Sequence, residues 1–381
     1  MRVALAHDYL NQEGGAERVV EVFCRTYPDS PLYTSLYNPA AMDPFWRTVD
    51  VRTSFMQALR PSLGVAKALL PLYPLAFESF NFSGYDVALS SSSTFAKGII
   101  TGPETYHVCY CHTPARYAWM YHDYTGAMRP NPLRQALLPP LVSRLRVWDY
   151  AAAQRVDHYI ANSRNTARRI AKFYRRESTV LHPPIDVGSF TPAATTDDYY
   201  LVLARLLPYK RIDIAIEAFN RLKRPLLVVG DGPDAARLRR LAGPTVRFTG
   251  RVGGNAVRRY LSHCRALVFP GDEDLGIAPL EAMASGRPVL AYRAGGALET
   301  VLGGVTGQFF DAQTPESLLA ALRAFDTRGF DPAVLRAHVS EFDLPIFQQR
   351  LRAIIETAAQ RRPREEKRGT IALQESYTRD N

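Results

Sequence analysis

The sequence contains little cysteine and no long apolar run. Four cysteines in 381 residues are too few for a disulfide framework, which favours a reducing compartment. The longest apolar candidate for a membrane span, residues 64–77, is interrupted by Lys67, Pro71 and Pro74 and is shorter than the roughly 20 apolar residues of a spanning helix. The first residues, M-R-V-A-L-A-H, are typical of a short buried strand rather than a signal peptide. We therefore expect a cytoplasmic protein that does not cross a membrane.

Acidic residues are scarce relative to basic ones. The sequence has 37 Asp and Glu against 47 Lys and Arg, which gives a formal net charge of +10 and favours anionic partners. A nucleic-acid-binding protein would account for this charge, but the basic residues are scattered and no nucleic-acid-binding motif accompanies them. We therefore expect phosphorylated ligands or an acidic lipid surface, and no nucleic acid.

Apolar residues make up 46% of the chain, which is enough for two domains with cores of their own. Short β-prone runs alternate with helix-forming runs in both halves, as in doubly wound parallel sheets. In the first half we predict strands at residues 3–6, 87–90, 106–111 and 157–161. In the second half we predict them at residues 199–204, 226–230, 246–249, 266–270 and 288–291.

A segment rich in Pro, Thr and Asp separates the two halves and is typical of a linker. We predict an α/β protein of two Rossmann-like domains that face one another across a central cleft. The predicted boundaries are an N-terminal domain at 1–187, a linker at 188–198, a C-terminal domain at 199–345, a helix at 346–360 that crosses back to the N-terminal domain, and a polar tail at 361–381.

The most informative stretch is E-D-L-G-I-A-P-L-E, from Glu273 to Glu281. A β-prone run precedes it and helix-forming sequence follows, so Glu273 is expected in a turn and Glu281 about one turn inside a helix. Open parallel sheets bind ligands at the carboxyl ends of their strands, where helix N-termini offer free N–H groups to phosphate. We therefore expect Glu273 to face the cleft and Glu281 to accept hydrogen bonds from a polyol such as ribose.

Two cationic side chains follow the first predicted strand of the C-terminal domain. Arg205 and Lys210 come just before a predicted helix at residues 212–222. Cations at a helix N-terminus oppose the helix dipole, so this placement favours a bound anion. A guanidinium and an ammonium together suit a diphosphate and would stabilise a departing phosphate. The alternative is a solvated basic start of a helix.

Glycines follow two other predicted strands. Gly14 and Gly15 lie in N-Q-E-G-G-A-E-R, and Gly230 lies in V-V-G-D-G-P-D. Glycine allows the backbone to approach a phosphate or a sugar closely. The first segment lacks the G-x-G-x-x-G spacing of a dinucleotide fold, and no G-x-x-x-x-G-K-[ST] phosphate loop occurs in the chain. For Gly14 and Gly15, a plain structural turn is the alternative.

His112 follows the predicted strand at residues 106–111, within Y-C-H-T-P-A-R-Y-A-W. Its position beside Arg116, Tyr117 and Trp119 favours a sugar-binding pocket, which combines aromatic faces with polar donors. A structural histidine is the alternative. The C-x-C-H pattern lacks a second pair of zinc ligands, and the acidic triplet at 272–274 lies near cations that can neutralise a diphosphate, so we expect no metal.

Taken together, these residues resemble the retaining GT-B glycosyltransferases of family 4, which use sugar nucleotides. The resemblance depends on R-x4-K at Arg205 and Lys210 combined with E-x7-E at Glu273 and Glu281, and it extends from the Gly14-Gly15 loop to Glu299. It implies a GT-B fold in which the N-terminal domain binds the acceptor and the C-terminal domain binds the nucleotide sugar.

The resemblance also implies residue roles: the cations bind the donor pyrophosphate, Glu281 binds the ribose, and Glu273 and His112 lie by the sugar. The implied catalytic residues are His112, Glu273, Arg205 and Lys210. The implied donor-binding residues are Gly14, Gly15, Arg205, Lys210, Gly230, Glu273, Leu275, Gly276, Ile277, Ala278 and Glu281. The implied acceptor-binding residues are Arg116, Tyr117 and Trp119. Many members have a larger aromatic residue at the position of Leu275.

The implied reaction moves a sugar from a nucleoside diphosphate to an acceptor hydroxyl with retention, and requires no cofactor beyond the donor substrate. Segments C-H-T-P-A-R-Y-A-W and P-Y-K-R-I-D resemble bacterial O-antigen and exopolysaccharide enzymes, so mannose from GDP-mannose is the first candidate donor. The expected acceptor is a saccharide or a polyprenyl-diphosphate-linked saccharide. The resemblance favours front-face attack with Glu273 orienting the sugar, and a nucleophilic Glu273 stays open. The alternatives are a UDP-sugar donor, a non-hydrolysing sugar-nucleotide epimerase and a catalytically silent sugar-nucleotide sensor.

Residues 55–82 mix Arg60 and Lys67 with Leu, Tyr and Phe, as interfacial segments do. With the positive net charge, this composition favours peripheral contact with an anionic membrane, at the inner face of the cell membrane. Ordinary core helices beneath the cleft are the alternative.

Overall fold

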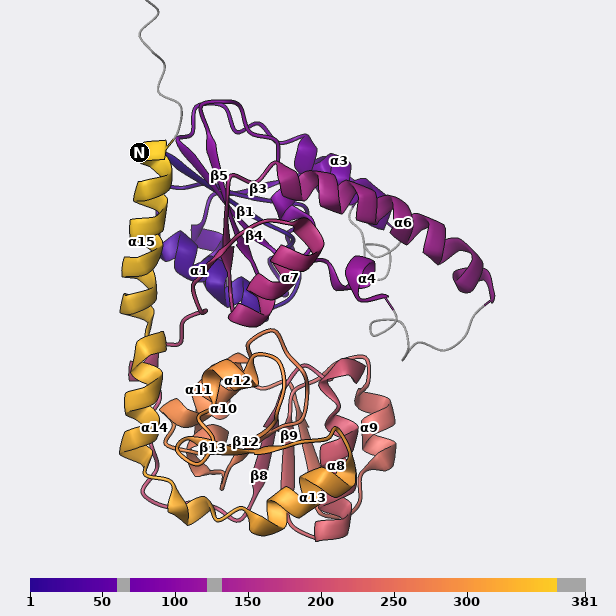
Figure 1. Ribbon diagram of the computed structural model, residues 1–381, viewed down its shortest axis with the longest axis vertical. Helices are drawn as coiled ribbons and strands as arrows, with labels where there is room; N and C mark the ends of the chain where they lie inside the picture. Colours follow the sequence, from indigo (N-terminus) through magenta and orange to yellow (C-terminus); the bar gives the residue numbers. More distant parts are fainter. Residues whose placement is uncertain (60–68, 122–131, 362–381) are drawn as a thin grey trace, which may run out of the picture.

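The computed structural model describes residues 1–59, 69–121 and 132–361 and shows two α/β domains stacked along the long axis of the molecule (Figure 1). Each domain has one sheet whose strand pairs are all parallel. Helices cover both faces of each sheet (Figure 1), which is the doubly wound arrangement. The predicted fold class is confirmed. Apart from Arg361, the predicted polar tail lies outside the described residues.

The N-terminal sheet contains β1 (Val3–His7), β2 (Leu32–Thr34), β3 (Val51–Thr53), β4 (Val87–Ser92), β5 (Tyr106–Cys111), β6 (His158–Ala161) and β7 (Thr179–Val180). Its α-helices are α1 (Gly15–Thr26), α3 (Tyr73–Glu78), α4 (Arg116–Trp119), α6 (Pro132–Gln154) and α7 (Arg164–Tyr174). Short 3-10 helices include η1 (Pro44–Thr48), η2 (Phe55–Leu59), η3 (Leu70–Leu72), η4 (Ala96–Gly98) and η5 (Val187–Ser189).

The C-terminal sheet contains β8 (Tyr200–Leu203), β9 (Leu226–Val229), β10 (Val246–Gly250), β11 (Leu267–Phe269), β12 (Val289–Tyr292) and β13 (Gly307–Phe310). Its helices are α8 (Ile212–Leu222), α9 (Ala235–Leu241), α10 (Gly254–His263), α11 (Ile277–Ala284), α12 (Ala297–Thr300), α13 (Pro315–Ala324) and α14 (Pro332–Val339), with 3-10 turns η6 (Pro208–Lys210), η7 (Thr327–Gly329) and η8 (Ser340–Phe342). The last helix is α15 (Leu344–Arg361).

The strand orders place two crevices. The N-terminal sheet runs β3-β2-β1-β4-β5-β6-β7 and the C-terminal sheet runs β10-β9-β8-β11-β12-β13. In each sheet the order reverses after its first strand, between β1 and β4 and between β8 and β11. Ligands of doubly wound sheets bind outside the carboxyl ends of the strands at this reversal. The loops after β1, β4, β8 and β11 are therefore the first places to look for a site.

Alternate residues of β1 build the two layers of the N-terminal domain. Val3 and Leu5 pack in a cluster with α1 and α15, whereas Ala4 and Ala6 pack in a cluster with α3 and α6. This alternation is the period of two that a strand imposes. All residues of β1 are buried, which agrees with the apolar character of residues 3–6.

The helix predicted at residues 212–222 is confirmed as α8 (Ile212–Leu222). Its buried residues include Ile212, Ile216 and Phe219, which recur at the three- and four-residue spacing of one helical face. They pack against Tyr200 and Val202 of β8 in the main core of the C-terminal domain. The core therefore holds the amino end of α8 beside the end of β8.

The structure contains four short strands that the sequence did not predict: β2, β3, β7 and β13. They are two to four residues long, and the two residues of β7 are too few to show the period of a strand. Pairing fixes them instead, because β2 joins β1 to the edge strand β3, while β7 and β13 close the other edges of the two sheets.

The chain crosses between the domains twice. Ile185 and Phe190 are buried in a C-terminal core cluster, so the chain enters that domain slightly before the predicted boundary at residue 187. Near the end, α15 returns to the N-terminal domain (Figure 1), where Phe347, Leu351 and Ile355 are buried with residues of β1 and α1. The four-residue spacing puts these three side chains on one face of the helix.

No helix in the described part of the chain combines the length and apolar character that a membrane crossing requires.

Candidate active site

A partly buried ion pair lies at the strand-order reversal of the C-terminal sheet. Lys210, in the loop after β8, places its Nζ 2.7 Å from Oε1 of Glu273, in the loop after β11. The two side chains are only 14% and 16% exposed. Burial lowers the pKa of Lys210, but the Glu273 carboxylate and Tyr209 together outweigh burial and the pKa is raised. A charged Lys210 is therefore available at the position predicted to hold a diphosphate.

Glycines fix the turn that carries Glu273 into helix α11. Gly276 has φ +87° and caps α11, and a Cβ there would lie 2.5 Å from the ring of Phe269. From the loop after β12, Gly296 packs so closely on the turn that a Cβ would meet the backbone of Leu275 at 2.1 Å, and its N–H donates to the Glu273 carbonyl. Side chains cannot be accommodated at these positions, so the direction of Glu273 is determined by backbone contacts.

Glu281 lies further along α11 and pairs with the N-terminal domain. It is 6% exposed, and Arg18 of α1 donates from Nη1 to its Oε1 at 2.5 Å. The Glu281 charge raises the pKa of Arg18. A Cβ on Gly15 would lie 3.1 Å from Ile277 of α11. The glycine loop of the N-terminal domain therefore lies directly against α11 of the C-terminal domain.

Arg205 is exposed just after β8, and within the described residues no carboxylate lies at ion-pair distance from it. Ala204, the residue before Arg205, is in close backbone contact with Gly230. This glycine has φ +131°, and a Cβ there would meet the Ala204 carbonyl oxygen at 1.9 Å. Gly230 thus makes a close backbone contact with the loop after β8, and its donor-binding role stays a prediction.

His112 lies at the end of β5 beside the ends of β1 and β4. Its Nε2 is 2.8 Å from Oγ of Ser91, and Nδ1 of His7 is 3.2 Å from the same hydroxyl. Burial, and then the nearby His7, lower the pKa of His112 to about 3. His7 differs: burial lowers its pKa, but Glu17, with Oε1 3.7 Å from Nε2, leads the effects that raise it above its ordinary value.

Two arginines of the N-terminal domain converge on Asp274. Arg116 places Nη2 2.8 Å from Asp274 Oδ1, and Arg169 of α7 donates to the same oxygen. The Arg116 guanidinium also lies 4.9 Å from the centre of the Tyr209 ring, a cation–π contact. Arg116 is thus positioned at the cleft, where the sequence predicted an acceptor-binding role.

The other two predicted acceptor residues pack inside the N-terminal domain. Trp119 stacks on Phe173 with ring centroids 5.1 Å apart and donates from Nε1 to the buried Asp149. Tyr117 packs against Phe95, with ring centroids 6.3 Å apart. Their acceptor-binding role stays a prediction.

A third interdomain contact lies at the start of α7. Glu299, in α12 of the C-terminal domain, accepts hydrogen bonds from the backbone N–H groups of Arg164 and Asn165 and lies 3.1 Å from His182. Burial raises the pKa of Glu299, but the hydrogen bond to His182 and those from the two backbone N–H groups outweigh burial and the pKa is lowered. The carboxylate complements the positive end of the α7 dipole.

Sequence reasoning missed Arg18, Arg169, Asp274 and Glu299 as groups that join the domains. Arg18 and Glu281 are 263 positions apart, and local patterns do not reveal pairs at such separation. The position of Arg18 at the first turn of the helix after the glycine loop was the only available signal. Arg18–Glu281 and the two arginines on Asp274 pair cations of the N-terminal domain with carboxylates of the C-terminal domain, whereas Arg251–Glu13 has the opposite polarity.

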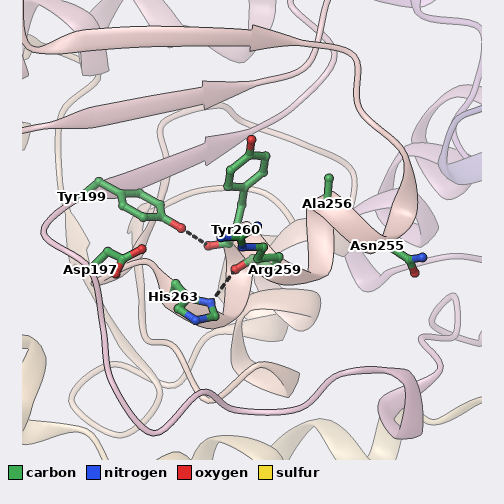
Figure 2. Close-up of a pocket in the computed structure, with 7 residues that line it drawn as sticks. All are labelled: Asp197, Tyr199, Asn255, Ala256, Arg259, Tyr260 and His263. Atoms are coloured by element: carbon green, nitrogen blue, oxygen red, sulfur yellow. Dashed lines mark hydrogen bonds between the residues drawn. The ribbon is translucent and has the colours of Figure 1, made fainter.

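A pocket of about 460 Å³ lies elsewhere in the C-terminal domain, lined by Asp197, Tyr199, Asn255, Ala256, Arg259, Tyr260 and His263 (Figure 2). Figure 2 shows the Tyr199 hydroxyl donating to the Tyr260 carbonyl. Tyr199 directly precedes β8, so this pocket is at the amino end of the sheet. It contains none of the predicted site residues, which follow the strands.

In the described part of the chain, no group of three or more His, Cys, Asp or Glu side chains is arranged to hold a metal ion.

The fold and the site together define a two-domain α/β protein with a charged cleft at the carboxyl ends of two parallel sheets.

Two family models match adjoining parts of the chain. Residues 13–189 match "Glycosyltransferase Family 4" and residues 197–325 match "Glycosyl transferases group 1". The chain belongs to the GT-B glycosyltransferases of family 4.

Curated relatives match over part of their length. A GDP-mannose-dependent alpha-(1-6)-phosphatidylinositol monomannoside mannosyltransferase of Mycolicibacterium smegmatis is 32% identical over 194 residues, which cover 42% of this chain and 50% of the relative. A GDP-mannose-dependent monoacylated alpha-(1-6)-phosphatidylinositol monomannoside mannosyltransferase of Corynebacterium glutamicum is 33% identical over 232 residues, which cover 51% of this chain and 61% of the relative. The chain thus spans about half to three fifths of these two relatives.

Solved structures share the fold over nearly the whole chain. HepE of Anabaena in complex with UDP and glucose aligns with a TM-score of 0.69 at 19% identity and covers 94% of this chain and 100% of the HepE chain. A sucrose-phosphate synthase of Thermosynechococcus elongatus aligns with a TM-score of 0.73 at 15% identity and covers 94% and 99% of the two chains.

Proposed function

We propose that the protein transfers a hexosyl group from a nucleoside diphosphate to a hydroxyl of a saccharide or lipid-linked acceptor, with retention and without a metal ion. GDP-mannose is the first donor to test. The observation that carries the proposal is the Lys210–Glu273 pair at 2.7 Å, located at the strand-order reversal of the C-terminal sheet. Family membership and the names of the two curated relatives support the reaction and the donor.

The leaving group is a nucleoside diphosphate, whose negative charge grows as the glycosidic bond breaks. Lys210 and Arg205 are the cations that stabilise this growing charge. Free backbone N–H groups contribute as well, both at the start of α11 and in the glycine loop at Gly15. Glu281 accepts the ribose hydroxyls. In the free protein the Arg18 guanidinium donates a hydrogen bond to the Glu281 carboxylate. The ribose hydroxyls therefore replace this guanidinium when the sugar nucleotide binds.

Retention follows from front-face attack, in which a phosphate oxygen of the leaving group helps to deprotonate the acceptor. Glu273 orients the sugar in this mechanism and is not the nucleophile. Its hydrogen bond to Lys210 supports that role, because a carboxylate that is already bonded to an ammonium is a weaker nucleophile than a free one.

The test is nucleotide release from a panel of GDP- and UDP-sugars, GDP-mannose first, with EDTA and with magnesium in parallel. We expect selective release that EDTA does not abolish, and a product with the anomeric configuration of the donor by NMR. Selective release from UDP-sugars would replace the donor assignment, and an isomerised sugar nucleotide without acceptor would favour an epimerase. Failure to bind any sugar nucleotide would contradict the proposal.

Peripheral contact with an anionic membrane belongs to the same proposal, because a lipid-linked acceptor resides there. Within the segment at 55–82, of which residues 60–68 lie outside the described part, Phe55, Leu59 and Leu75 are 44%, 54% and 57% exposed. Figure 1 shows α3, which carries Leu75, beside α6, and Trp148 of α6 donates to Glu78 of α3. The exposed side chains thus extend from a packed part of the N-terminal domain.

Cosedimentation with anionic and with neutral vesicles tests this contact. We expect binding to anionic vesicles that Leu75→Asp weakens. Val334→Asp, at a similarly exposed apolar position of the C-terminal domain (43% exposed), is the matched control and should leave binding unchanged. Equal binding of the wild-type protein to both vesicle types would contradict an electrostatic contact.

A further inference from the structure

Three side chains from adjacent strands make a hydrogen-bonded chain behind the proposed sugar site. His7 ends β1, Ser91 lies in β4 and His112 follows β5. The register pairs His7 with Ser91, and His112 follows Cys111, which pairs with Ser92. All three residues are buried or nearly so, with relative exposures of 1%, 0% and 9%.

The direction of the first hydrogen bond is fixed by chemistry. Nδ1 of His7 lies 3.1 Å from the backbone carbonyl oxygen of Ser91 and 3.2 Å from its hydroxyl. A carbonyl oxygen can only accept, so Nδ1 of His7 carries a hydrogen. This holds whether His7 is neutral or protonated, and Glu17 on the far side of the ring favours the protonated form.

The second hydrogen bond follows from the first. Because His7 donates, the Ser91 hydroxyl hydrogen needs another acceptor, and within the described residues only Nε2 of His112 lies at hydrogen-bonding distance, 2.8 Å away. His112 is neutral, since burial and His7 lower its pKa to about 3 while the Asp274 charge only partly opposes them. A neutral imidazole that accepts at Nε2 has its hydrogen on Nδ1.

Other contacts hold the His112 ring and its backbone in place. The Tyr110 ring packs edge-on at 5.2 Å, the His112 N–H donates to the Ser92 carbonyl, and the Thr166 hydroxyl donates to the His112 carbonyl. Nδ1 has no hydrogen-bond partner in the described part of the chain, yet it is not among the fully buried polar atoms that lack one. It is therefore the ring atom that remains for a ligand.

We propose that His7 and Ser91 are positioning residues that fix His112 as its Nδ1–H tautomer, so that His112 donates a hydrogen bond to an oxygen of the bound sugar nucleotide and does not act as a base. The last step rests on the proposed function, whereas the tautomer is a property of the free protein. A donor at this place agrees with a mechanism in which the leaving phosphate, and not a histidine, deprotonates the acceptor.

The tautomer is measured directly by long-range proton–nitrogen NMR on the full-length protein labelled with nitrogen-15 histidine, with His112 assigned through His112→Gln. We expect a protonated Nδ1 and an unprotonated Nε2 at neutral pH. Ser91→Ala should move the hydrogen toward Nε2, and Ser91→Thr, which keeps the hydroxyl, should retain the wild-type tautomer. A wild-type His112 protonated at Nε2, or a tautomer that Ser91→Ala does not change, would overturn the proposal.

The chain offers a matched control one residue away. Ser90 and His107 form the same kind of pair, with Oγ and Nε2 also 2.8 Å apart, and the pKa of His107 is also lowered to about 3, mainly by burial. Ser90→Ala removes an equivalent buried hydrogen bond, so it should change the stability much as Ser91→Ala does. It should leave the His112 tautomer as it is in the wild type.

Turnover gives the second measurement. Ser91→Ala should lower kcat roughly ten- to a hundredfold, by analogy with the range seen when the residue that orients a metal-bound histidine is removed. His7→Asn, whose amide N–H can replace Nδ1–H, should retain more activity than His7→Ala. If a nucleoside diphosphate alone shifts the His112 nitrogen signals, the oxygen that accepts the hydrogen bond from Nδ1–H belongs to the phosphate. If only the sugar nucleotide shifts them, that oxygen belongs to the sugar. Absence of turnover with every sugar nucleotide would count against the proposed function, whereas the tautomer is judged from the NMR alone.

Discussion

Replacing Lys210 by methionine removes the charge from the proposed diphosphate site and keeps most of the aliphatic stem. In the structure the ammonium is bonded to Glu273 at 2.7 Å and lies 5.9 Å from the centre of the Tyr209 ring. If Lys210 also stabilises the leaving diphosphate, its loss should affect the transition state more than the bound ground state. The variant therefore separates a catalytic cation from one that only pairs with Glu273.

The expected loss is large. Removal of one preorganised group that stabilises developing charge typically lowers kcat about 100- to 1,000-fold, or roughly 3–4 kcal/mol of transition-state stabilisation. The fold should also lose stability, because the Glu273 carboxyl group, 16% exposed, loses its hydrogen-bond partner, at a cost of about 1–3 kcal/mol. The activity loss should exceed the stability loss at a temperature where the variant is folded.

The pH dependence gives an independent check. Because the pKa of Lys210 is raised above its ordinary value of 10.5, its contribution to stability is fully present below that value and is lost as the pH rises through the raised pKa. In Glu273→Gln the strongest opposing charge is gone and burial remains, so the pKa of Lys210 should fall. The alkaline loss of activity should then begin at a lower pH than in the wild-type protein.

The assay is steady-state nucleotide release with the preferred donor, together with thermal unfolding of the same samples. Lys172→Met, which removes an exposed charge from α7, is the control for net charge. Turnover of Lys210→Met within a factor of about three of the wild type would refute the role of Lys210. Equal losses in Lys210→Met and Lys172→Met would point to overall charge as the cause.

Three further predictions concern stability. Gly230→Ala should destabilise the C-terminal domain by about 2–5 kcal/mol, because Gly230 has a positive φ and a Cβ there would lie only 1.9 Å from a backbone oxygen. Gly102→Ala is the control, since a Cβ on Gly102 would have no neighbour within 4 Å. Equal melting temperatures of the two variants would show that the loop at Gly230 moves to accommodate the Cβ. Lys97→Met should lower the free energy of unfolding in denaturant by about 3–5 kcal/mol, because it removes the charge partner of the buried Asp149 carboxylate. If the unpaired charge is the cause, the double variant with Asp149→Leu should regain much of that loss. Glu299→Gln should destabilise the protein near neutral pH, and because the pKa of Glu299 is lowered from 4.5, the difference from the wild type should vanish as the pH falls through the lowered pKa; a difference that persists in acid would contradict an electrostatic origin.

The elements that bound the C-terminal site were visible in the sequence. Apolar runs predicted β8 and β11, helical periodicity predicted α8, and the position of Gly276 before helix-forming residues predicted the start of α11. These signals are local, since each depends on residues within one or two turns. They were enough to place Lys210 and Glu273 each after a strand of a parallel sheet, and the structure shows that these two strands are neighbours.

Edge strands and the interdomain partners were not visible. The two residues of β7 and the three of β3 become strands only because a neighbouring strand pairs with them. Arg116 was predicted to bind an acceptor, and the structure shows it also paired with Asp274, a carboxylate that the sequence analysis considered only in connection with metals.

The sequence by itself determined the fold class, the loops that carry the charged and glycine residues, and the family, because strand and helix periods and short motifs are properties of neighbouring residues. Only the tertiary structure decided which of these groups meet. Strand order and register place His7 and Ser91 beside His112, and the approach of the two domains pairs Arg18 with Glu281 across 263 positions. Such contacts depend on the packing of whole sheets and domains, which no local pattern contains.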